Sequence, residues 1–342
     1  MRYKLAAVGP GLVDIHIKLP DADFAKMCAV NAIKAGDWRE IKHRREFDLI
    51  LRDLGVSDYE ALAVGTVQQA TLVAGSSTLS MLAAQPQSMR GDCTYVCAVG
   101  AFNGLAGPMA RFFEESVKRM GLGCVAKKVE GDNPMGLVVA ARSNPEKVLY
   151  FYPGIARSTT LDLSGLECEI LIIDAYELQA GPLADLLHRT IDSGRYRIAL
   201  SLGNRSVLQG ALLQWIRQHF QNGRIYAVAG NLDEYQALTP ETASRYLSRE
   251  EFGNHPIAKC TAHALLTLGA AGMIASSKGE TFFAEAAPLD LSAIVNTSGA
   301  GDVAAGIFFG GIVESMPMTS TLNHASKMAR AVLQVPSSMV LG

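Results

Sequence analysis

The sequence predicts an α/β fold, in which helices cover both faces of a mostly parallel sheet. Two observations predict it. Short apolar runs recur along the chain, and each is continuous rather than alternating, as expected of strands buried on both sides. Segments of helical periodicity lie between them, such as residues 107–122 and 181–194. Strands that alternate with helices in this way are typical of a doubly wound sheet.

The expected elements follow in chain order. The strands of the sheet are residues 4–9, 94–100, 169–176, 196–203, 225–230 and 264–269. Residues 15–60 are more polar, and "DADFAKMC" and "DWREIKHRREFDLILRDLG" within them look helical. Residues 126–152 alternate instead, which predicts two strands joined by a polar turn at residues 143–147.

These two irregular regions, about 15–45 and 126–152, are expected to contribute a small β lid over the carboxyl edge of the sheet. No internal repeat, low-complexity tract or linker divides the chain. One domain is therefore expected over residues 1–342.

Composition argues against several classes of protein. Hydrophobic residues make up 49% of the chain and charged residues 19%, enough apolar material for a large core. The formal net charge of −2 gives no basic excess for nucleic acid, and no apolar run has the length of a membrane span. The six cysteines form no Cys-x-x-Cys pair, so neither zinc nor a disulfide framework is expected. We expect a cytoplasmic globular protein.

The most informative stretch is "AIVNTSGAGDVAAGIFFGGIVESM", residues 293–316, in which Asp302 precedes a long apolar run. Gly299 and Gly301 permit a turn that other residues resist. A helix that begins near Asp302 would direct its free N–H groups into this turn and form an anion site. Asp302 itself has two interpretations, a helix cap or a general base beside a bound phosphate. The residues alone leave both open.

This stretch resembles the C-terminal motif of the ribokinase-like (PfkB) family of carbohydrate and nucleoside kinases, usually Asp-Thr-x-Gly-Ala-Gly-Asp. The chain matches it at Thr297, Gly299, Ala300, Gly301 and Asp302. The resemblance implies a ribokinase-like three-layer αβα sandwich with a small β lid. It also implies ATP as the phosphate donor, Asp302 as the general base, and the backbone of Gly299, Ala300 and Gly301 as the anion hole.

Further segments resemble the family on the nucleotide side. "GNLDEYQAL" is similar to its Asn-x-x-Glu segment, and "TLGAAGM" to its Thr-Leu-Gly-x-x-Gly turn. The residues implied to contact nucleotide are Asn231, Glu234, Thr267, Gly269, Gly272 and Thr297. Glu234 is also implied to hold Mg²⁺ through water. The alternative for Asn231 and Glu234 is a helix cap.

On the substrate side, "VGPGLVDI" resembles the family's opening strand, whose final Asp, here Asp14, binds a substrate hydroxyl. "AGSSTL" is similar to its Gly-Gly-Ser-x-x-Asn segment and implies contacts from Gly75 and Ser76. Leu79 stands where that segment has Asn, so a hydroxyl anchor is lost or the substrate presents an apolar group there. "DADFAKMCAVNAIKAGDWREI" is similar to an insertion of the adenosine-kinase-like bacterial branch.

Two other departures concern charge. The family's acidic glycine turn appears as "AFNGLAG", without the acid, and Asn296 replaces the first Asp of the C-terminal motif. The second change removes a negative charge near the phosphate, together with any site for a monovalent cation such as K⁺ built on that Asp. The phosphoryl-transfer end therefore matches the family better than the substrate end does.

The leading hypothesis is an ATP- and Mg²⁺-dependent kinase that phosphorylates a hydroxymethyl group of a sugar. The alternatives are an adenosine or other nucleoside kinase, and a non-catalytic nucleotide- or sugar-binding relative. A nicotinamide dehydrogenase is disfavoured, because "GPGLVD" has Asp14 in place of the third glycine of a dinucleotide-binding turn. A homodimer through the lid, the position phosphorylated and the cation requirement stay open.

Overall fold

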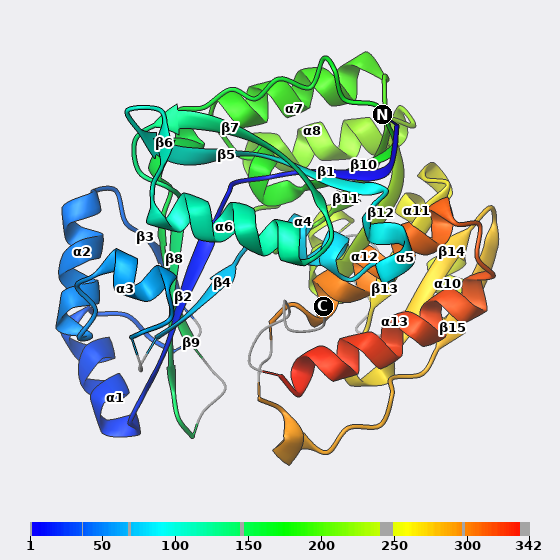
Figure 1. Ribbon diagram of the computed structural model, residues 1–342. Coiled ribbons are helices and arrows are strands. Elements are labelled where there is room, and N and C mark those ends of the chain that lie inside the picture. Colours follow the sequence, from blue (N-terminus) through cyan, green and yellow to red (C-terminus); the bar gives the residue numbers. More distant parts are fainter. Residues whose placement is uncertain are drawn as a thin grey trace.

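The computed structural model describes residues 2–35, 37–67, 70–143, 147–239, 249–295 and 298–335. Its large sheet has the order β15-β14-β13-β12-β11-β10-β1-β5-β6, and β7 pairs with β5 (Figure 1). The strands are β1 (Tyr3–Val8), β5 (Cys93–Phe102), β6 (Leu105–Ala106), β7 (Gly123–Glu130), β10 (Cys168–Asp174), β11 (Arg197–Ser201), β12 (Ile225–Asn231), β13 (His263–Thr267), β14 (Met273–Ser277) and β15 (Glu280–Ala284). The six strands predicted for this sheet are confirmed as β1, β5, β10, β11, β12 and β13.

Successive side chains of the central strands enter two different cores, as buried strands require. In β10, Ile170 and Ile172 belong to one core, while Leu171 and Ile173 belong to the other. The first core is covered by α4 (Ser77–Ala83), α5 (Gln87–Arg90), α6 (Pro108–Arg119), α12 (Ala300–Val313) and α13 (Met318–Leu333). The second is covered by α7 (Pro182–Ser193), α8 (Gly210–Gln221), α9 (Leu232–Leu238), α10 (Arg249–Gly253) and α11 (Pro256–Cys260). The predicted αβα sandwich is confirmed.

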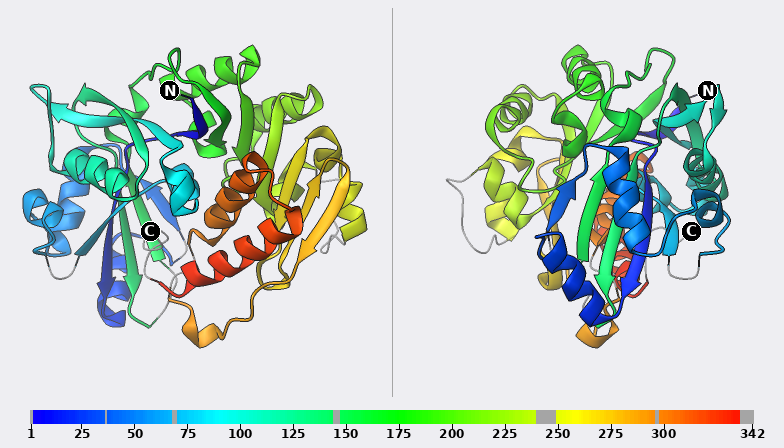
Figure 2. Two further views of the ribbon diagram at one scale, coloured as in Figure 1. Left: turned by 45° about the vertical axis from the view of Figure 1, so that its right-hand side comes forward. Right: turned by 90° about the vertical axis from the view of Figure 1, so that its left-hand side faces the viewer.

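A second, smaller sheet stands beside the first (Figures 1 and 2). Its order is β3-β9-β8-β2-β4. The strands are β2 (Val13–Leu19), β3 (Trp38–Glu40), β4 (Ala70–Ala74), β8 (Met135–Ala141) and β9 (Lys147–Tyr152). One face packs on α1 (Asp21–Val30) and α2 (Arg44–Asp53), with α3 (Tyr59–Ala63) nearby, and the other face is turned toward α12 and α13 (Figure 1).

The second sheet differs from the sequence expectation in three places. Residues 13–19 and 38–40 are strands, although the segments around them were expected to be helical or irregular. β4 was not predicted, because its five residues carry no strong alternation. Residues 126–130 belong to β7 in the large sheet, so the hairpin of the second sheet begins only at Met135. This edge strand is half exposed and carries polar residues such as Lys127 and Lys128, so it lacks the continuous apolar run by which the buried strands of the large sheet were predicted.

The apolar helix that follows Asp302 is α12, and its glycines explain how it is buried. A Cβ on Gly306 would lie 2.3 Å from the carbonyl oxygen of Met81 in α4, and one on Gly310 would lie 1.9 Å from Oε1 of Gln85. The Gln85 side chain also donates to the carbonyl of Gly306 at 2.7 Å. α12 is therefore held against α4 at backbone contact distance, which fixes where its N-terminus lies.

Gly306→Ala should destabilise the fold by about 1–3 kcal/mol, because the added methyl overpacks a backbone–backbone contact. Gly301→Ala in the same helix is the control, since a Cβ there would meet nothing within 4 Å and should leave stability equal or higher. Urea denaturation of the two variants measures both effects. Equal midpoints for the two variants would show that α12 and α4 are not tightly fitted.

The six cysteines are all free thiols. No group of three or more His, Cys, Asp and Glu side chains within the described ranges is arranged to hold a metal ion. None of the helices in the described part of the chain is long and apolar enough to cross a membrane.

Candidate active site

The N-terminus of α12 is open toward the turn that the sequence singled out. Gly299 is the N-cap residue, with φ of +86°, and the helix begins at Ala300 rather than near Asp302. The first helical hydrogen bond runs from Val303 N to Gly299 O at 2.9 Å. The N–H groups of Ala300, Gly301 and Asp302 therefore have no acceptor within the helix. These groups and the positive end of the helix dipole favour an anion at this place.

Asp302 is not the capping residue, since Gly299 occupies that position. Its carboxyl group lies in the first turn of the helix, where burial, together with the charges of Asp174 and Glu234, raises its pKa to about 7. Asp302 and Glu234 therefore lie near enough for their charges to interact, although they are far apart in the sequence. A carboxylate with a pKa near neutrality is suited to accept and release a proton.

Asp174 is the site residue that sequence reasoning missed. It ends β10, is only 2% exposed, and uses Oδ1 to accept from Tyr176 N at 2.9 Å. Its Oδ2 is buried and has no hydrogen-bond partner within the described residues. Burial raises the pKa of Asp174 to about 6. An acid at the carboxyl end of an apolar parallel strand was the available signal, because ligands bind at that edge.

Asn231 and Glu234 form a reciprocal cap at the start of α9. Glu234 N donates to Asn231 Oδ1 at 3.0 Å, while Glu234 Oε2 accepts from Asn231 N at 2.9 Å and Oε1 accepts from Nδ2 at 2.7 Å. Glu234 is 5% exposed, and burial raises its pKa to about 7. The cap thus fixes the buried Glu234 carboxylate where its charge acts on Asp174 and Asp302. Asn231 and Glu234 can therefore cap the helix and also serve the site.

The predicted nucleotide-side turn follows the neighbouring strand. Thr267 ends β13, opposite Asn231 of β12, and its hydroxyl donates to Gly230 O at 3.4 Å. Gly269 and Gly272 have φ of +58° and +103° in the turn that leads to β14. A Cβ on Gly272 would lie 2.2 Å from the carbonyl oxygen of Ala284, so this glycine is required by packing. Asn296 and Thr297 lie outside the described residues.

On the substrate side, Asp14 of β2 lies between two glycines. A Cβ on Gly75 would be 2.5 Å from its Oδ2, and one on Gly136 would be 1.9 Å from its Oδ1. Neither oxygen accepts a hydrogen bond within the described part of the chain, and burial raises the pKa of Asp14 to about 6. The glycines leave room for a carboxylate whose hydrogen-bonding capacity is unused, as a residue that binds a hydroxyl requires.

Ser76 and Leu79 have structural contacts. Ser76 has φ of +102° and caps α4, where Leu79 N donates to its Oγ at 3.1 Å. The same oxygen lies 2.8 Å from the hydroxyl of Tyr95, which donates to Pro10 O at 3.0 Å. The Leu79 side chain is 0% exposed in the core. Leu79 therefore packs the start of α4 and presents no apolar surface to a substrate, contrary to one expectation.

A further carboxylate, that of Glu177, interacts with residues on both the nucleotide side and the substrate side. Burial, together with the charge of Asp174, raises the pKa of Glu177 to about 8. Glu177 also lies near enough to Tyr95 to contribute to the raised pKa of that phenol, which is due first to burial. The nucleotide-side and substrate-side residues are thus connected through the end of β10.

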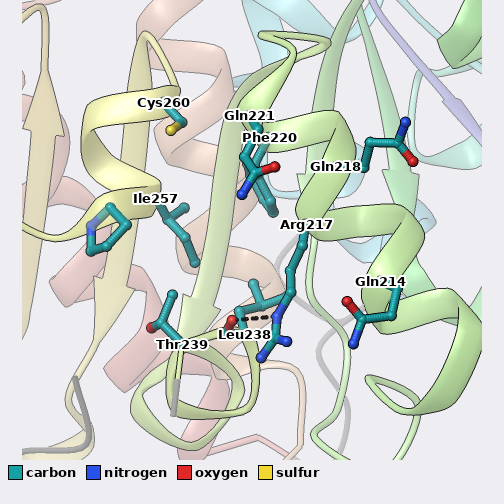
Figure 3. A pocket seen from close by; sticks show the side chains of 10 residues that line it. Gln214, Arg217, Gln218, Phe220, Gln221, Leu238, Thr239, Ile257 and Cys260 are labelled. Atoms are coloured by element: carbon teal, nitrogen blue, oxygen red, sulfur yellow. Dashed lines mark hydrogen bonds between the residues drawn. The ribbon is translucent and has the colours of Figure 1, made fainter. Parts of the chain in front are cut away.

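A cavity of about 550 Å³ lies elsewhere, between α8, α9 and α11 (Figure 3). Its lining includes Arg217, whose Nε donates to Leu238 O at 2.7 Å. None of the predicted site residues lines it. The carboxylates described above, and not this cavity, form the candidate active site.

Known structures share this fold over almost the whole chain. Adenosine kinase from Sinorhizobium meliloti superposes with a TM-score of 0.75 and 16% identity, covering 100% of this chain and 98% of that one. A probable sugar kinase from Rhizobium etli CFN 42 gives 0.73 and 16%, covering 98% and 95%. Adenosine kinase from Anopheles gambiae, in complex with P1,P4-di(adenosine-5) tetraphosphate, gives 0.71 and 15%, covering 100% and 98%.

Sequence comparison is more specific about the family. No curated protein matches the chain. The model of the pfkB family carbohydrate kinases matches residues 80–340, a range that includes Asp174, Glu234 and the whole of α12. The chain belongs to the pfkB family of carbohydrate kinases.

Proposed function

We propose that this protein transfers the γ-phosphate of ATP to a hydroxymethyl group of a sugar, either free or within a nucleoside. The observation that carries the proposal is the N-terminus of α12, where the first N–H groups have no acceptor within the helix and where the charges of Asp174 and Glu234 act on Asp302. A phosphate and a carboxylate repel each other electrostatically. Their placement side by side therefore indicates that the carboxylate takes part in the reaction. Proton transfer from the attacking hydroxyl is that role.

In the proposed mechanism, Asp14 orients the acceptor by accepting hydrogen bonds from its hydroxyl groups, with the backbone near Gly75 and Ser76 beside it. Asp302 takes the proton of the attacking hydroxymethyl group. The N–H groups of Ala300 and Gly301 hold the charge that develops on the transferred group. The second sheet closes over the acceptor and excludes water.

ATP would lie along the C-terminal half, with its base near the Gly269–Ala271 turn and α13 and its phosphates at the start of α12. Mg²⁺ fits the residues present, since the unpartnered Oδ2 of Asp174 is a hard oxygen donor and Glu234 offers a second carboxylate. When bound, Mg²⁺ neutralises charge on the phosphate oxygens. We propose that Asp174 and Glu234 hold it, Glu234 through water. A K⁺ requirement and a homodimer through the second sheet remain predictions.

A coupled assay of ADP release over a panel of sugars and nucleosides tests the proposal. Acceptor-dependent ADP release that requires Mg²⁺ supports it. Nucleotide binding without transfer to any acceptor would instead support the non-catalytic alternative.

The pH profile of kcat/KM should show an acidic limb. Asp302 must be ionised to act as a base, and its pKa is raised to about 7. Activity should therefore rise with pH through about 7 and level off above it, with a near tenfold loss for each pH unit below. The profile is measured between about pH 5 and 9 at low acceptor concentration. A flat profile below pH 7 would contradict Asp302 as the base.

A further inference from the structure

The face of the second sheet that is turned away from α1 and α2 carries a row of small side chains. Gly136, Val138 and Ala140 occupy alternate positions on β8 and so share one face. Their neighbours on the other face of β8, such as Leu137 and Val139, are buried in the core under the helices. The row lies between β2 and β9, which pair with β8 on its two sides. We call this strip of β8, which β2 and β9 flank, the trough.

The two walls of this trough differ in chemistry. The register places Asp14 and His16 of β2 opposite Gly136 and Val138. On the other side, it places Phe151 opposite Gly136, Leu149 opposite Val138 and Lys147 opposite Ala140. The β2 side is therefore polar. The β9 side is apolar at Phe151 and Leu149 and ends with Lys147, at the strand position farthest from Asp14.

Lys147 acts on Asp14 through its charge. Its ammonium lies near enough to Asp14 to oppose the increase in pKa that burial causes there. It also helps to keep the pKa of His16 at about 4, where burial is the main cause. The charge of Lys147 thus acts on both polar residues of the trough, and His16 is neutral at physiological pH.

The length of the trough limits what it can hold. Lys147 lies four residues beyond Asp14 in the register, because Asp14 pairs with Gly136 and Lys147 with Ala140. Four residues of strand span about 13 Å. A monosaccharide whose hydroxyls bind Asp14 would leave the strand position of Leu149 uncovered. A nucleoside is long enough to place its ribose at Asp14 and its base along Phe151 and Leu149.

We propose that the acceptor is a nucleoside whose base ends in a carbonyl oxygen, and that Lys147 with His16 selects it. This inference rests on the proposed kinase function. A lysine ammonium only donates hydrogen bonds, so it complements a carbonyl oxygen and opposes an exocyclic amino group in the same place. Phe151, Leu149 and Val138 supply the apolar contact that a planar base requires.

Two matched pairs of nucleosides test the selection, inosine against adenosine and uridine against cytidine, since the members of each pair differ chiefly at the oxo or amino group. The wild-type protein should show kcat/KM at least about tenfold higher for the oxo member of one pair. Lys147→Met should lower kcat/KM for that member about 10- to 100-fold and change the amino member little, so the preference disappears.

Lys147→Arg keeps the charge and should keep the preference, and Lys128→Met, on the exposed edge of the large sheet, should leave both rates unchanged. Thermal melting confirms that each variant is folded. Three outcomes would overturn the inference. They are a wild-type preference for the amino nucleosides, equal losses of kcat/KM for both members of a pair in Lys147→Met, and phosphorylation of monosaccharides alone. Those outcomes leave the kinase proposal intact, whereas no ADP release with any acceptor would remove the kinase proposal itself.

Discussion

Replacing Asp302 by Asn should lower kcat by about 10³-fold while ATP still binds, because general-base catalysis contributes roughly 10²- to 10⁴-fold. The amide keeps the shape of the side chain but cannot accept the proton. The helical N–H groups at Ala300 and Gly301 are backbone groups and remain in place. Steady-state kinetics and nucleotide titration by calorimetry measure the two quantities separately.

Asp185→Asn is the matched control, because Asp185 also lies in the first turn of a helix, α7, but on the exposed surface. It should have wild-type activity. Asp302→Asn should also melt no lower than the wild type, since burial makes the ionised Asp302 unfavourable for folding at neutral pH. Near-normal turnover in Asp302→Asn would remove the proposed base.

Asp14→Ala should lower kcat/KM for the acceptor about 100-fold with little change in the affinity for ATP. The change removes a charged hydrogen-bond acceptor whose two oxygens accept no hydrogen bond from the described residues, and bonds to a charged acceptor are the stronger ones in binding. Initial rates at varied acceptor and fixed, saturating ATP measure the effect. The melting temperature should not fall, because burial already raises the pKa of Asp14 and disfavours its charge.

Gly136→Val is a second way to disturb the same carboxylate, since even a Cβ there would lie 1.9 Å from Oδ1 of Asp14. Gly136→Val should weaken binding of the acceptor, as Asp14→Ala does. Asp53→Ala, at the exposed end of α2, is the control and should change nothing. An unchanged acceptor KM in both Asp14→Ala and Gly136→Val would show that the acceptor binds elsewhere.

The sequence predicts the large sheet well because its strands are buried on both faces. Runs such as "EILIIDAY" have no other stable place in a folded chain, and all six were found. The second sheet is harder to predict because one face packs on helices and the other is partly exposed. β3 and β4 have three and five residues, too few for a periodicity to emerge. Their positions are determined by pairing with β9 and β2, which are remote in the sequence.

Prediction of the site succeeds where a local motif carries the chemistry. Gly299 and Asp302 lie within one turn, and Asn231 and Glu234 form one cap. Asp174 and Lys147 belong to no such motif. Their significance arises from the fold, which brings the end of β10 near the start of α12 and pairs the start of β9 with the end of β8. Leu79 shows the converse, because its place in a motif suggested a substrate contact that its burial in α4 rules out.

The most direct test of the proposed phosphoryl transfer is to identify its product. The protein is incubated with Mg²⁺, ATP and the best acceptor from the panel, and the products are followed by ³¹P NMR. We expect a new phosphomonoester on a hydroxymethyl carbon, formed in equal amount with ADP by the wild-type protein and about 10³-fold more slowly by Asp302→Asn. Release of inorganic phosphate without any phosphorylated acceptor, or an equal rate in the two proteins, would contradict it.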